Sequence, residues 1–364
     1  MVAKNPFQLS VIADCFGILA ATFYRWYKEF LSDFRTDKEQ HTLHQHDILI
    51  KKINNNEGQN ILVPILIPEN MGESMAIDEK HINNIFYTVL TNAITGKVAL
   101  MINSMNPKYV GQTLLKFAHK LKMVKIITRD LSPTFKSIAD QFFPNAIQVA
   151  DKYHIIAYAT DAVQDLRTKY RQENASRERK LQAQHLIKYK EYKLKLTAKT
   201  TENLIKVSKI WHPEKLRNGE TIAEILARSR YLLFKKPEKW NDYQRSRSEI
   251  LFEKFPLLKE AFELINDFRN WYEPNEIKDS NWNYLTAETQ LMHWMDLAES
   301  SKTEEILNFR ALLERHFQPI LNYHLQYKTN AIAESVNAKI KTALTNNKGA
   351  RDLDFFHFRL KMIL

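Results

Sequence analysis

The segment 123-MVKIITRD-130 decides the fold, because it is a largely apolar run that ends on an acidic residue. Such a run is typical of a short buried strand, here closing at Arg129 and Asp130. Pro133 suits the first turn of a helix, so we expect a helix from Pro133 to Phe142. Residues 146–150 then form a second short apolar strand, which ends at Asp151. The segment therefore predicts a strand–helix–strand unit with an aspartate after each strand.

Three further strands are expected upstream of this unit. They cover residues 74–82, 85–92 and 97–104, and the last two are joined across Thr95-Gly96 like a hairpin. A helical stretch from 107 to 121 follows them. The element order is βββαβαβ, which indicates an α/β fold with a mixed five-stranded sheet, flanking helices and an antiparallel hairpin at one side.

Acidic residues interrupt the apolar strands at two places. The sequence Ile77-Asp78-Glu79-Lys80 puts Asp78 inside the first strand, and Asp130 stands where the fourth strand ends. Burial of a carboxylate costs several kcal/mol unless the group is paired or bound to a metal. Two such acids on neighbouring strands suggest a divalent-ion site. The alternative is salt bridging at the sheet rim to Lys80, Lys125 or Arg129.

A polar stripe near the C-terminus supplies a third acid. Asn330, Glu334, Asn337 and Lys341 are spaced four, three and four residues apart, so they share one face of an expected helix. Alanines at 331, 333 and 338 allow such a helix to pack close to a sheet. Glu334 is then available to a site that contains Asp78 and Asp130. Taken alone, the stripe is more typical of a solvated helix face than of a metal site.

The N-terminal segment from Gln8 to Lys28 has the pattern of a helix-turn-helix. Gly17 can adopt the positive φ of the turn, and Phe23 and Trp26 are expected to pin the second helix to the first. This leaves Thr22, Tyr24, Arg25 and Lys28 to contact DNA. The alternative is a helical hairpin used for packing or dimerisation, which the net charge of −2 over residues 1–75 favours.

The charge of the chain favours a polyanionic partner. Its 364 residues carry 53 Lys and Arg against 42 Asp and Glu, a net charge of +11 with a pI near 9.3. The excess is concentrated in residues 76–155 at +5, 156–200 at +6 and 330–364 at +3. Residues 156–200 are expected to form a long basic helix, in which Arg167, Arg171, Arg177 and Lys180 are placed to lie along phosphates. A solvated charged face is the alternative.

Several classes of protein are excluded by composition. The seven glycines never cluster into a dinucleotide-binding or P-loop motif, and the single Cys15 rules out disulfides and C-x-x-C zinc ribbons. The longest apolar stretch, residues 61–67, is interrupted by Pro64 and is far shorter than a membrane span. We therefore expect a soluble, cytoplasmic protein.

These motifs resemble the DDE transposases of bacterial insertion sequences. That family places its first Asp on strand one, its second just after strand four and its Glu on a later helix, and Asp78, Asp130 and Glu334 match in order and element. The family's Tyr, Arg, Glu, Lys pattern is matched by Tyr327, Glu334 and Lys341, with Asn330 where Arg is usual. Closer resemblance to the group with an N-terminal zinc ribbon and helix-turn-helix lies in the motifs 129-RDLS-132, 149-VADKYH-154 and 330-NAIAESVN-337.

The resemblance implies an RNase H-like (retroviral-integrase-like) core. It also implies Mg²⁺-dependent DNA cleavage at the element's ends and strand transfer, with two Mg²⁺ or Mn²⁺ ions held by Asp78, Asp130 and Glu334. Lys341 is expected to contact a phosphate, and His154 to position substrate or water. The residues that could substitute in or beside the metal site are Glu79, Asp151, Asn330 and Asn337.

The long separation between Asp130 and Glu334 implies a helical insertion. We expect five segments: a helix-turn-helix-like segment (1–36), a linker (37–73), the first part of the core (74–160), an α-helical insertion domain (161–322) and the C-terminal part of the core (323–364). The partners implied are double-stranded DNA, a second copy of the chain in a dimer or higher oligomer, and a separate polypeptide supplying the missing zinc ribbon. The alternatives are a catalytically silent DNA-binding descendant and a structure-selective nuclease of the same fold.

Overall fold

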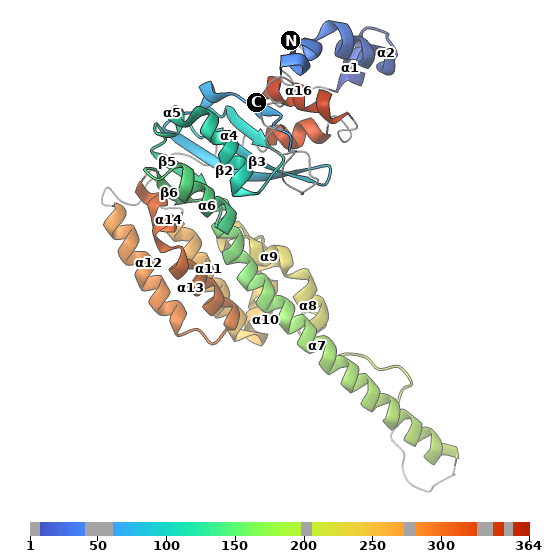
Figure 1. The fold of residues 1–364 in the computed structure, drawn as a ribbon. Helices are drawn as coiled ribbons and strands as arrows, with labels where there is room; N and C mark the ends of the chain where they lie inside the picture. The colour runs from blue at the N-terminus through green and yellow to red at the C-terminus, as the bar shows by residue number, and fades with distance from the viewer. Residues whose placement is uncertain (1–7, 41–60, 198–205, 273–281, 326–337, 346–351) are drawn as a thin grey trace. The chain divides into compact units, whose positions relative to one another are not determined.

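The computed structural model describes residues 8–40, 61–197, 206–272, 282–325, 338–345 and 352–364 (Figure 1). The chain divides into two compact units. Met1–His154 and His316–Leu364 form the sheet unit, and Ile155–Arg315 form the helical unit. Each unit is described by itself.

The sheet unit is built on a six-stranded mixed sheet with the order β1-β4-β3-β2-β5-β6. Its strands are β1 Ile65–Leu66, β2 Ser74–Ile82, β3 Ile85–Asn92, β4 Val98–Ile102, β5 Ile126–Arg129 and β6 Ile147–Ala150. β2, β3 and β4 form an antiparallel meander, and β5 and β6 run parallel to β2. This is the α/β, RNase H-like arrangement expected from the sequence. The sixth strand, β1, was expected to be linker, and it pairs with the edge of the sheet at β4.

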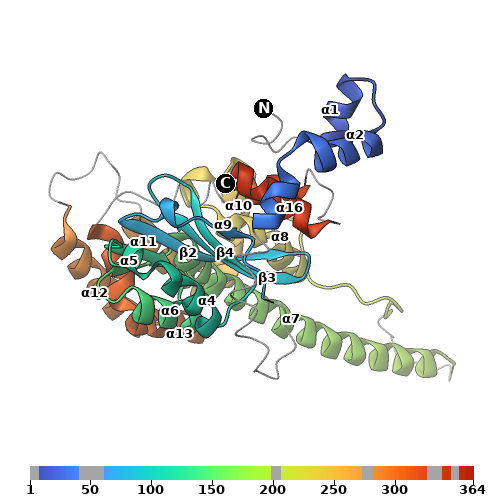
Figure 2. The same cartoon turned by 45° about the horizontal axis from the view of Figure 1, so that its top comes forward.

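One face of the sheet is covered by α4 (Pro107–Leu114), η4 (Leu115–Phe117), α5 (Ala118–Leu121) and α6 (Pro133–Phe142) (Figure 2). Val110, Phe117 and Phe135 pack there against strand residues such as Ile77. A Cβ atom at Gly111 would stand 1.9 Å from the Phe142 ring, so glycine permits α4 and α6 to approach closely.

The opposite face of the sheet is covered by C-terminal segments. The helical residues 338–345 place Ile340 and Ala343 against it, and α16 (Leu353–Ile363) adds Phe356 and Leu360. The hydroxyl of Tyr87 on β3 lies 3.1 Å from His357 Nε2 on α16, and burial raises the pKa of Tyr87 to about 12. The C-terminal segments are therefore an integral part of the sheet unit.

The N-terminal segment has the predicted helix–turn–helix form. α1 (Leu9–Cys15) and α2 (Ala20–Trp26) are separated by a turn with Gly17 at φ +64°, and the helix direction changes by 108°. A π-helical turn, η2 (Tyr27–Leu31), continues α2. The expected role of Trp26 is wrong: it is 42% exposed, and Tyr27, four residues after Phe23 and on the same face, is buried instead.

This N-terminal segment is anchored to the C-terminal helix. Its buried side chains Phe23, Tyr27 and Phe34 join Phe355 and Phe358 of α16 in one apolar cluster. Three ion pairs surround the cluster: Lys28 with Asp352, Lys38 with Asp354, and Lys361 with Asp37. One side of the helix pair therefore packs against α16, as the helical-hairpin alternative predicts.

The helical unit contains the body of α7 (Lys152–Thr197) with α8 (Ile222–Arg228), α9 (Arg230–Phe234), α10 (Asp242–Lys254), α11 (Pro256–Tyr272), α12 (Tyr284–Glu299) and α13 (Glu304–Arg315). Aromatic rings fill its core, where Phe268 contacts Trp271, Trp294 and Phe309. The indole groups of Trp271 and Trp294 donate to backbone carbonyls at 2.9 and 2.7 Å. These tryptophans serve packing, as buried aromatic residues commonly do.

The chain returns to the sheet unit through α14 (Phe317–Leu321) and η6 (Asn322–Leu325), and Asn322 Nδ2 donates to the Gln148 carbonyl on β6. Short 3₁₀ turns occupy Pro68–Asn70 and Pro237–Lys239. Among the described residues no single helix has the length and apolar composition to cross a membrane, although the bent pair Leu9–Cys15 and Ala20–Leu31 passes that test together.

Candidate active site

Three neighbouring parallel strands are in register at one side of the sheet. β5 lies between β2 and β6, and the register pairs Ile77 with Arg129 and Arg129 with Ala150. The residues that come next on the three strands are Asp78, Asp130 and Asp151. The Asp151 amide donates to the Arg129 carbonyl at 2.7 Å, which extends the register beyond β6. Backbone pairing alone thus brings three aspartates to one level of the sheet.

Asp78 lies on the sheet face that the C-terminal segments cover. Its register partner on β3 is Val89, and paired residues on antiparallel strands share a face. Val89 belongs to the apolar cluster that contains Ile340 and Phe356. Glu79 follows Asp78 directly, so strand alternation turns its side chain to the opposite face. The side chains of Asp78 and Glu79 therefore project from opposite faces of the sheet.

Lys80 neutralises Asp78 in this structure. The Lys80 ammonium lies 2.5 Å from Asp78 Oδ2, and both side chains are mainly buried, at 19% and 24% exposure. Asp78 Oδ1 accepts a hydrogen bond from the Glu79 amide at 2.7 Å. Lys80 is two residues after Asp78, so both side chains project from the same face of β2. The salt-bridge interpretation is realised for this pair.

Asp130 is held by a buried arginine. Arg129 is 1% exposed, and its Nη1 donates to the Asp130 carbonyl while its Nε donates to Gln148 Oε1, both at 2.8 Å. Burial lowers the pKa of Arg129. The Asp130 carboxylate accepts a hydrogen bond from the Ser132 amide at 2.6 Å, just before α6. Arg129 therefore fixes the turn that carries Asp130 and leaves the carboxylate of Asp130 for other partners.

Asp151 has a local structural role at the start of α7. Its Oδ1 accepts a hydrogen bond from the Tyr153 amide at 2.8 Å, the pattern of a helix cap. His154 stands in the first turn of α7, half-buried, with its ring edge-on to Tyr153. The third aspartate of the row is thus already engaged with the backbone.

The remaining predicted residues of the site lie at the C-terminal end of the sheet unit. Glu334, Asn330 and Asn337 fall outside the described residues. Lys341 is exposed on the helical segment 338–345, which packs through Ile340 against the face that carries Asp78. Glu334 lies four positions before the first described residue of that segment, Ala338.

The donor set suits a hard cation. Asp78 and Asp130 offer carboxylate oxygens, the ligands that Mg²⁺ prefers. Within the described ranges no group of three His, Cys, Asp or Glu side chains is close enough to hold a metal ion. A three-carboxylate site that includes Asp78 and Asp130 would therefore need a ligand from outside the described ranges, and Lys80 occupies Asp78 in this structure.

Two of the residues expected to bind DNA have other partners. Arg167 is 4% exposed, and its guanidinium donates to Gln164 Oε1 and to the Leu226 carbonyl at 2.8 Å, so its prediction as a phosphate contact is wrong. Lys28 is paired with Asp352 in this structure, and its assignment as a DNA contact stays a prediction. The side chains that remain exposed as expected are Arg25, Arg171, Arg177 and Lys180.

The buried Arg129–Gln148 contact was not recognised from the sequence. The sequence does contain a signal for it: an arginine inside an otherwise apolar strand needs a buried hydrogen-bond acceptor. The acceptor is on β6, and only the register of β5 with β6 identifies it.

Comparison with known proteins agrees with this geometry. The family model of the ISL3 group of DDE transposases, described as "Transposase", matches residues 75–360. No curated protein and no solved structure matches the chain. The matched range contains Asp78, Asp130 and Glu334 together with the whole helical unit. The chain therefore belongs to the DDE transposase family of bacterial insertion sequences.

Proposed function

We propose that this transposase cleaves DNA at the ends of its element and joins the freed 3′-hydroxyl groups to target DNA, with Asp78, Asp130 and Glu334 as the catalytic acids. One observation supports this most strongly. Asp78 and Asp130 follow paired positions on adjacent parallel strands, so the backbone fixes their separation. Fixed carboxylates are what a metal-dependent phosphodiester reaction needs.

In this proposal the three acids hold two Mg²⁺ or Mn²⁺ ions. Such a pair activates the attacking oxygen and neutralises the leaving oxygen of an in-line displacement. Asp78 is placed centrally, since β2 lies beside β5 and carries the face against which residues 338–345 pack. Glu334 precedes that segment by four residues, which supports its assignment as the third ligand.

The chain's own cations would support the reaction at the same face. With Asp78 bound to a metal ion, the Lys80 ammonium that pairs with it here would be available to a DNA phosphate. Lys341 is exposed on the segment that follows Glu334 and would contact a phosphate near the cut. His154, half-buried after β6, would position substrate or water.

The DNA partner is double-stranded and has two ends to process. One set of acids supplies a single site, so we propose that two or more copies of the chain assemble on paired ends, in keeping with the frequency of two-fold symmetry. A separately encoded polypeptide would supply the zinc ribbon that the single cysteine excludes here. Arg25 would contribute to DNA contact from the N-terminal helices, where it is exposed.

The test is a Mg²⁺-dependent assay on supercoiled DNA that carries the element's ends. The proposal predicts cleavage at the ends followed by joined products, and EDTA abolishes both. Cleavage at branched structures without joining would favour a structure-selective nuclease. Binding with neither cleavage nor joining would identify a catalytically silent descendant.

A further inference from the structure

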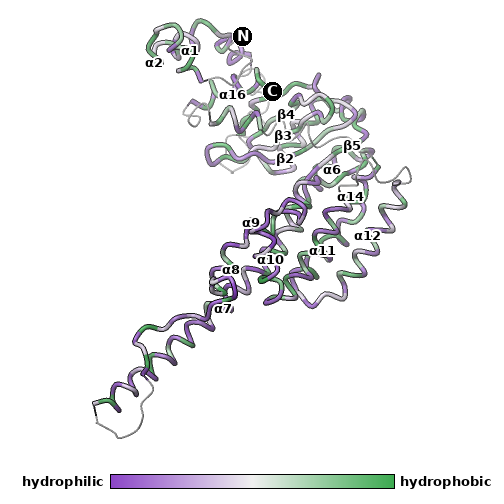
Figure 3. Tube along the Cα trace, turned by 180° about the vertical axis from the view of Figure 1, so that it is seen from behind, coloured by the Kyte–Doolittle hydropathy of each residue, from purple (hydrophilic) through white to green (hydrophobic). Residues whose placement is uncertain are grey.

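The distal part of α7 contains no buried residue. Asn174 is the last buried position of α7, and every residue from 175 to 197 is half-buried or exposed. We call residues 175–197 the basic arm. At 1.5 Å per residue the arm is about 35 Å long, which is about one turn of duplex DNA. Figure 3 shows its largely hydrophilic course beyond α8 and α10.

The arm carries a strong net positive charge. It contains seven Lys and Arg against two Glu, a net charge of +5 in 23 residues. Among the described residues, no hydrogen bond or ion pair engages the side chains of Lys188, Lys190 and Lys193. Exposed cations at this density attract a polyanion.

The charges form two stripes on the helix. Arg177, Lys180, Lys188 and Lys195 share one side, because their spacings of three, eight and seven residues are near whole turns. Arg179, Lys190 and Lys193 lie on the far side, about 160° away at 100° per residue. A helix with cations on both flanks matches a groove that has a phosphate backbone on each side.

The face between the two stripes is short and apolar. Ala183, Ile187 and Leu194 occupy it, and Ile187 and Leu194 are 57% and 71% exposed. The major groove of B-DNA is wide enough for an α-helix, and thymine methyl groups provide apolar contacts there. Lys190 interrupts the three-four spacing of this face, so it lacks the continuous apolar seam of a coiled coil.

The remaining face of the arm lies beside residues 206–219, which we call the return path. His185 Nε2 lies 2.8 Å from the Ser208 carbonyl, and Tyr189 and Tyr192 are half-buried on the same side.

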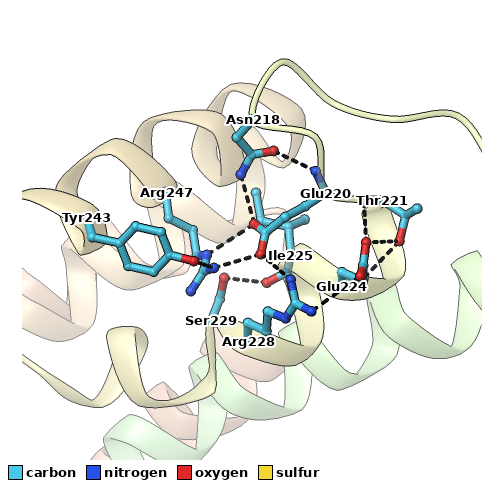
Figure 4. A network of polar contacts seen from close by, with 9 residues as sticks. All are labelled: Asn218, Glu220, Thr221, Glu224, Ile225, Arg228, Ser229, Tyr243 and Arg247. Atoms are coloured by element: carbon cyan, nitrogen blue, oxygen red, sulfur yellow. Dashed lines mark hydrogen bonds and ion pairs between the residues drawn. The ribbon is translucent and has the colours of Figure 1, made fainter.

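The base of the return path is locked by a buried ion network (Figure 4). Glu220 is 7% exposed and accepts hydrogen bonds from Arg247 Nη2 at 2.6 Å, Arg228 Nη1 at 2.8 Å and Asn218 Nδ2 at 2.8 Å. Burial alone would raise the pKa of Glu220, but the hydrogen bonds from Arg228 and Arg247 outweigh it and the pKa is lowered. The network ties the end of the return path to α8 and α10.

We infer that the basic arm is a duplex-DNA clamp that lies in the major groove and contacts phosphates on both strands without reading a defined sequence. The inference rests on the proposed transposase function and identifies the basic arm as one of its DNA-binding surfaces. It also moves the phosphate contacts away from Arg167, which is buried in the body of the helical unit.

The test uses the full chain with Lys188, Lys190 and Lys193 changed to Gln. The matched control changes Lys239, Lys254 and Lys302 to Gln, three exposed lysines elsewhere in the helical unit. Affinity for a duplex unrelated to the element is measured over a salt series by fluorescence anisotropy. Circular dichroism and thermal unfolding verify that both variants are folded.

The arm variant is expected to flatten the dependence of log K on log salt by about 2 to 3 units, since each lost phosphate contact removes about 0.9. The control should keep the wild-type slope to within about 0.5 unit. An unchanged slope in the arm variant would overturn the inference. So would equal losses in arm and control variants, because they would indicate a diffuse charge effect.

A second variant tests the competing partner, a second copy of the chain. Ile187→Ser with Leu194→Ser should leave the molar mass measured by light scattering unchanged in the absence of DNA. Dissociation of an oligomer by this pair would overturn the clamp in favour of a protein interface. If the arm variant binds DNA normally while wild-type protein cuts and joins element ends, the clamp fails and the proposed function stands.

Discussion

The strand ends that carry Asp78 and Asp130 and the basic arm of α7 are built in opposite ways. At the strand ends, backbone pairing in the sheet fixes each position, and a 1%-exposed Arg129 braces the turn after β5. The arm has no buried residue and carries its charges on flexible side chains. Metal chemistry demands carboxylates at set separations, whereas attraction to phosphates depends on charge density. In the proposed function, the strand ends would carry out the reaction and the arm would bind the DNA.

The same contrast appears within one helix. Arg167 is packed under α8 and bonded to the Leu226 carbonyl, while Arg177, ten residues later, is exposed. Their residue types are identical, and only their surroundings differ. Positive charge on a helix is therefore evidence of DNA contact only where the rest of the fold leaves it exposed.

The largest effect on stability is expected from Arg129→Met. The change leaves Gln148 Oε1 and the Asp130 carbonyl without their charged donor, so the free energy of unfolding should fall by about 3 kcal/mol. Urea unfolding monitored by hydrogen exchange of residues 126–150 measures it. Arg179→Met on the arm is the control, with a change below about 0.5 kcal/mol. Equal losses of unfolding free energy for the two variants would show that Arg129 is no more important for stability than an exposed arginine of the arm.

The sheet unit is expected to lose stability in acid because of the buried His324 on η6. Burial, with a smaller contribution from Lys152, lowers the pKa of His324 to about 4 from its ordinary 6.5. Between these values the unfolded chain binds more protons, so stability is complete above pH 6.5 and falls as the pH is lowered toward 4. The loss is at most about 3 kcal/mol. Urea unfolding from pH 7.5 to 4.5 should show a shallower decline for His324→Gln, and identical slopes would contradict the assignment.

A smaller effect is expected at the metal site itself. Lys80→Met removes the ammonium that pairs with Asp78, so the DNA-free protein should bind Mn²⁺ about fivefold more tightly, equivalent to ~1 kcal/mol. Calorimetric titration measures the change. Lys125→Met is the control, because Lys125 pairs with the exposed Glu73 away from the aspartate row. No difference between the two variants would show that Lys80 does not compete with the ion.

Much of the sheet could be predicted because its signals are local. The bounds of β2, β3 and α6 agree with expectation, since alternating or continuous apolar runs and a first-turn proline define them. β1 was not predicted, because prolines on both sides of Ile65–Leu66 are typical of linkers. Prolines are tolerated at sheet edges, and β1 is an edge strand.

The candidate site was predictable in composition and less so in its contacts. The order of Asp78, Asp130 and Glu334 can be read from the chain. The Arg129–Gln148 bond and the burial of Arg167 depend on which elements become neighbours, and charge patterns carry no such information. The arm is recognisable in the sequence as a basic stretch. Its two stripes are exposed only because no residue of α7 after Asn174 is buried, and the sequence alone does not predict that.

The most direct test of the account is a cleavage series on one DNA substrate. Asp78→Asn, Asp130→Asn and Glu334→Gln are compared with Asp151→Asn, whose carboxylate caps α7, while DNA binding is measured in parallel. The account predicts that the first three variants lose cleavage by at least about a thousandfold and bind DNA within about twofold of wild type, because each removes a metal ligand. Asp151→Asn should still cut. Wild-type cleavage by any of the three, or an active Asp130→Asn beside an inactive Asp151→Asn, would contradict it.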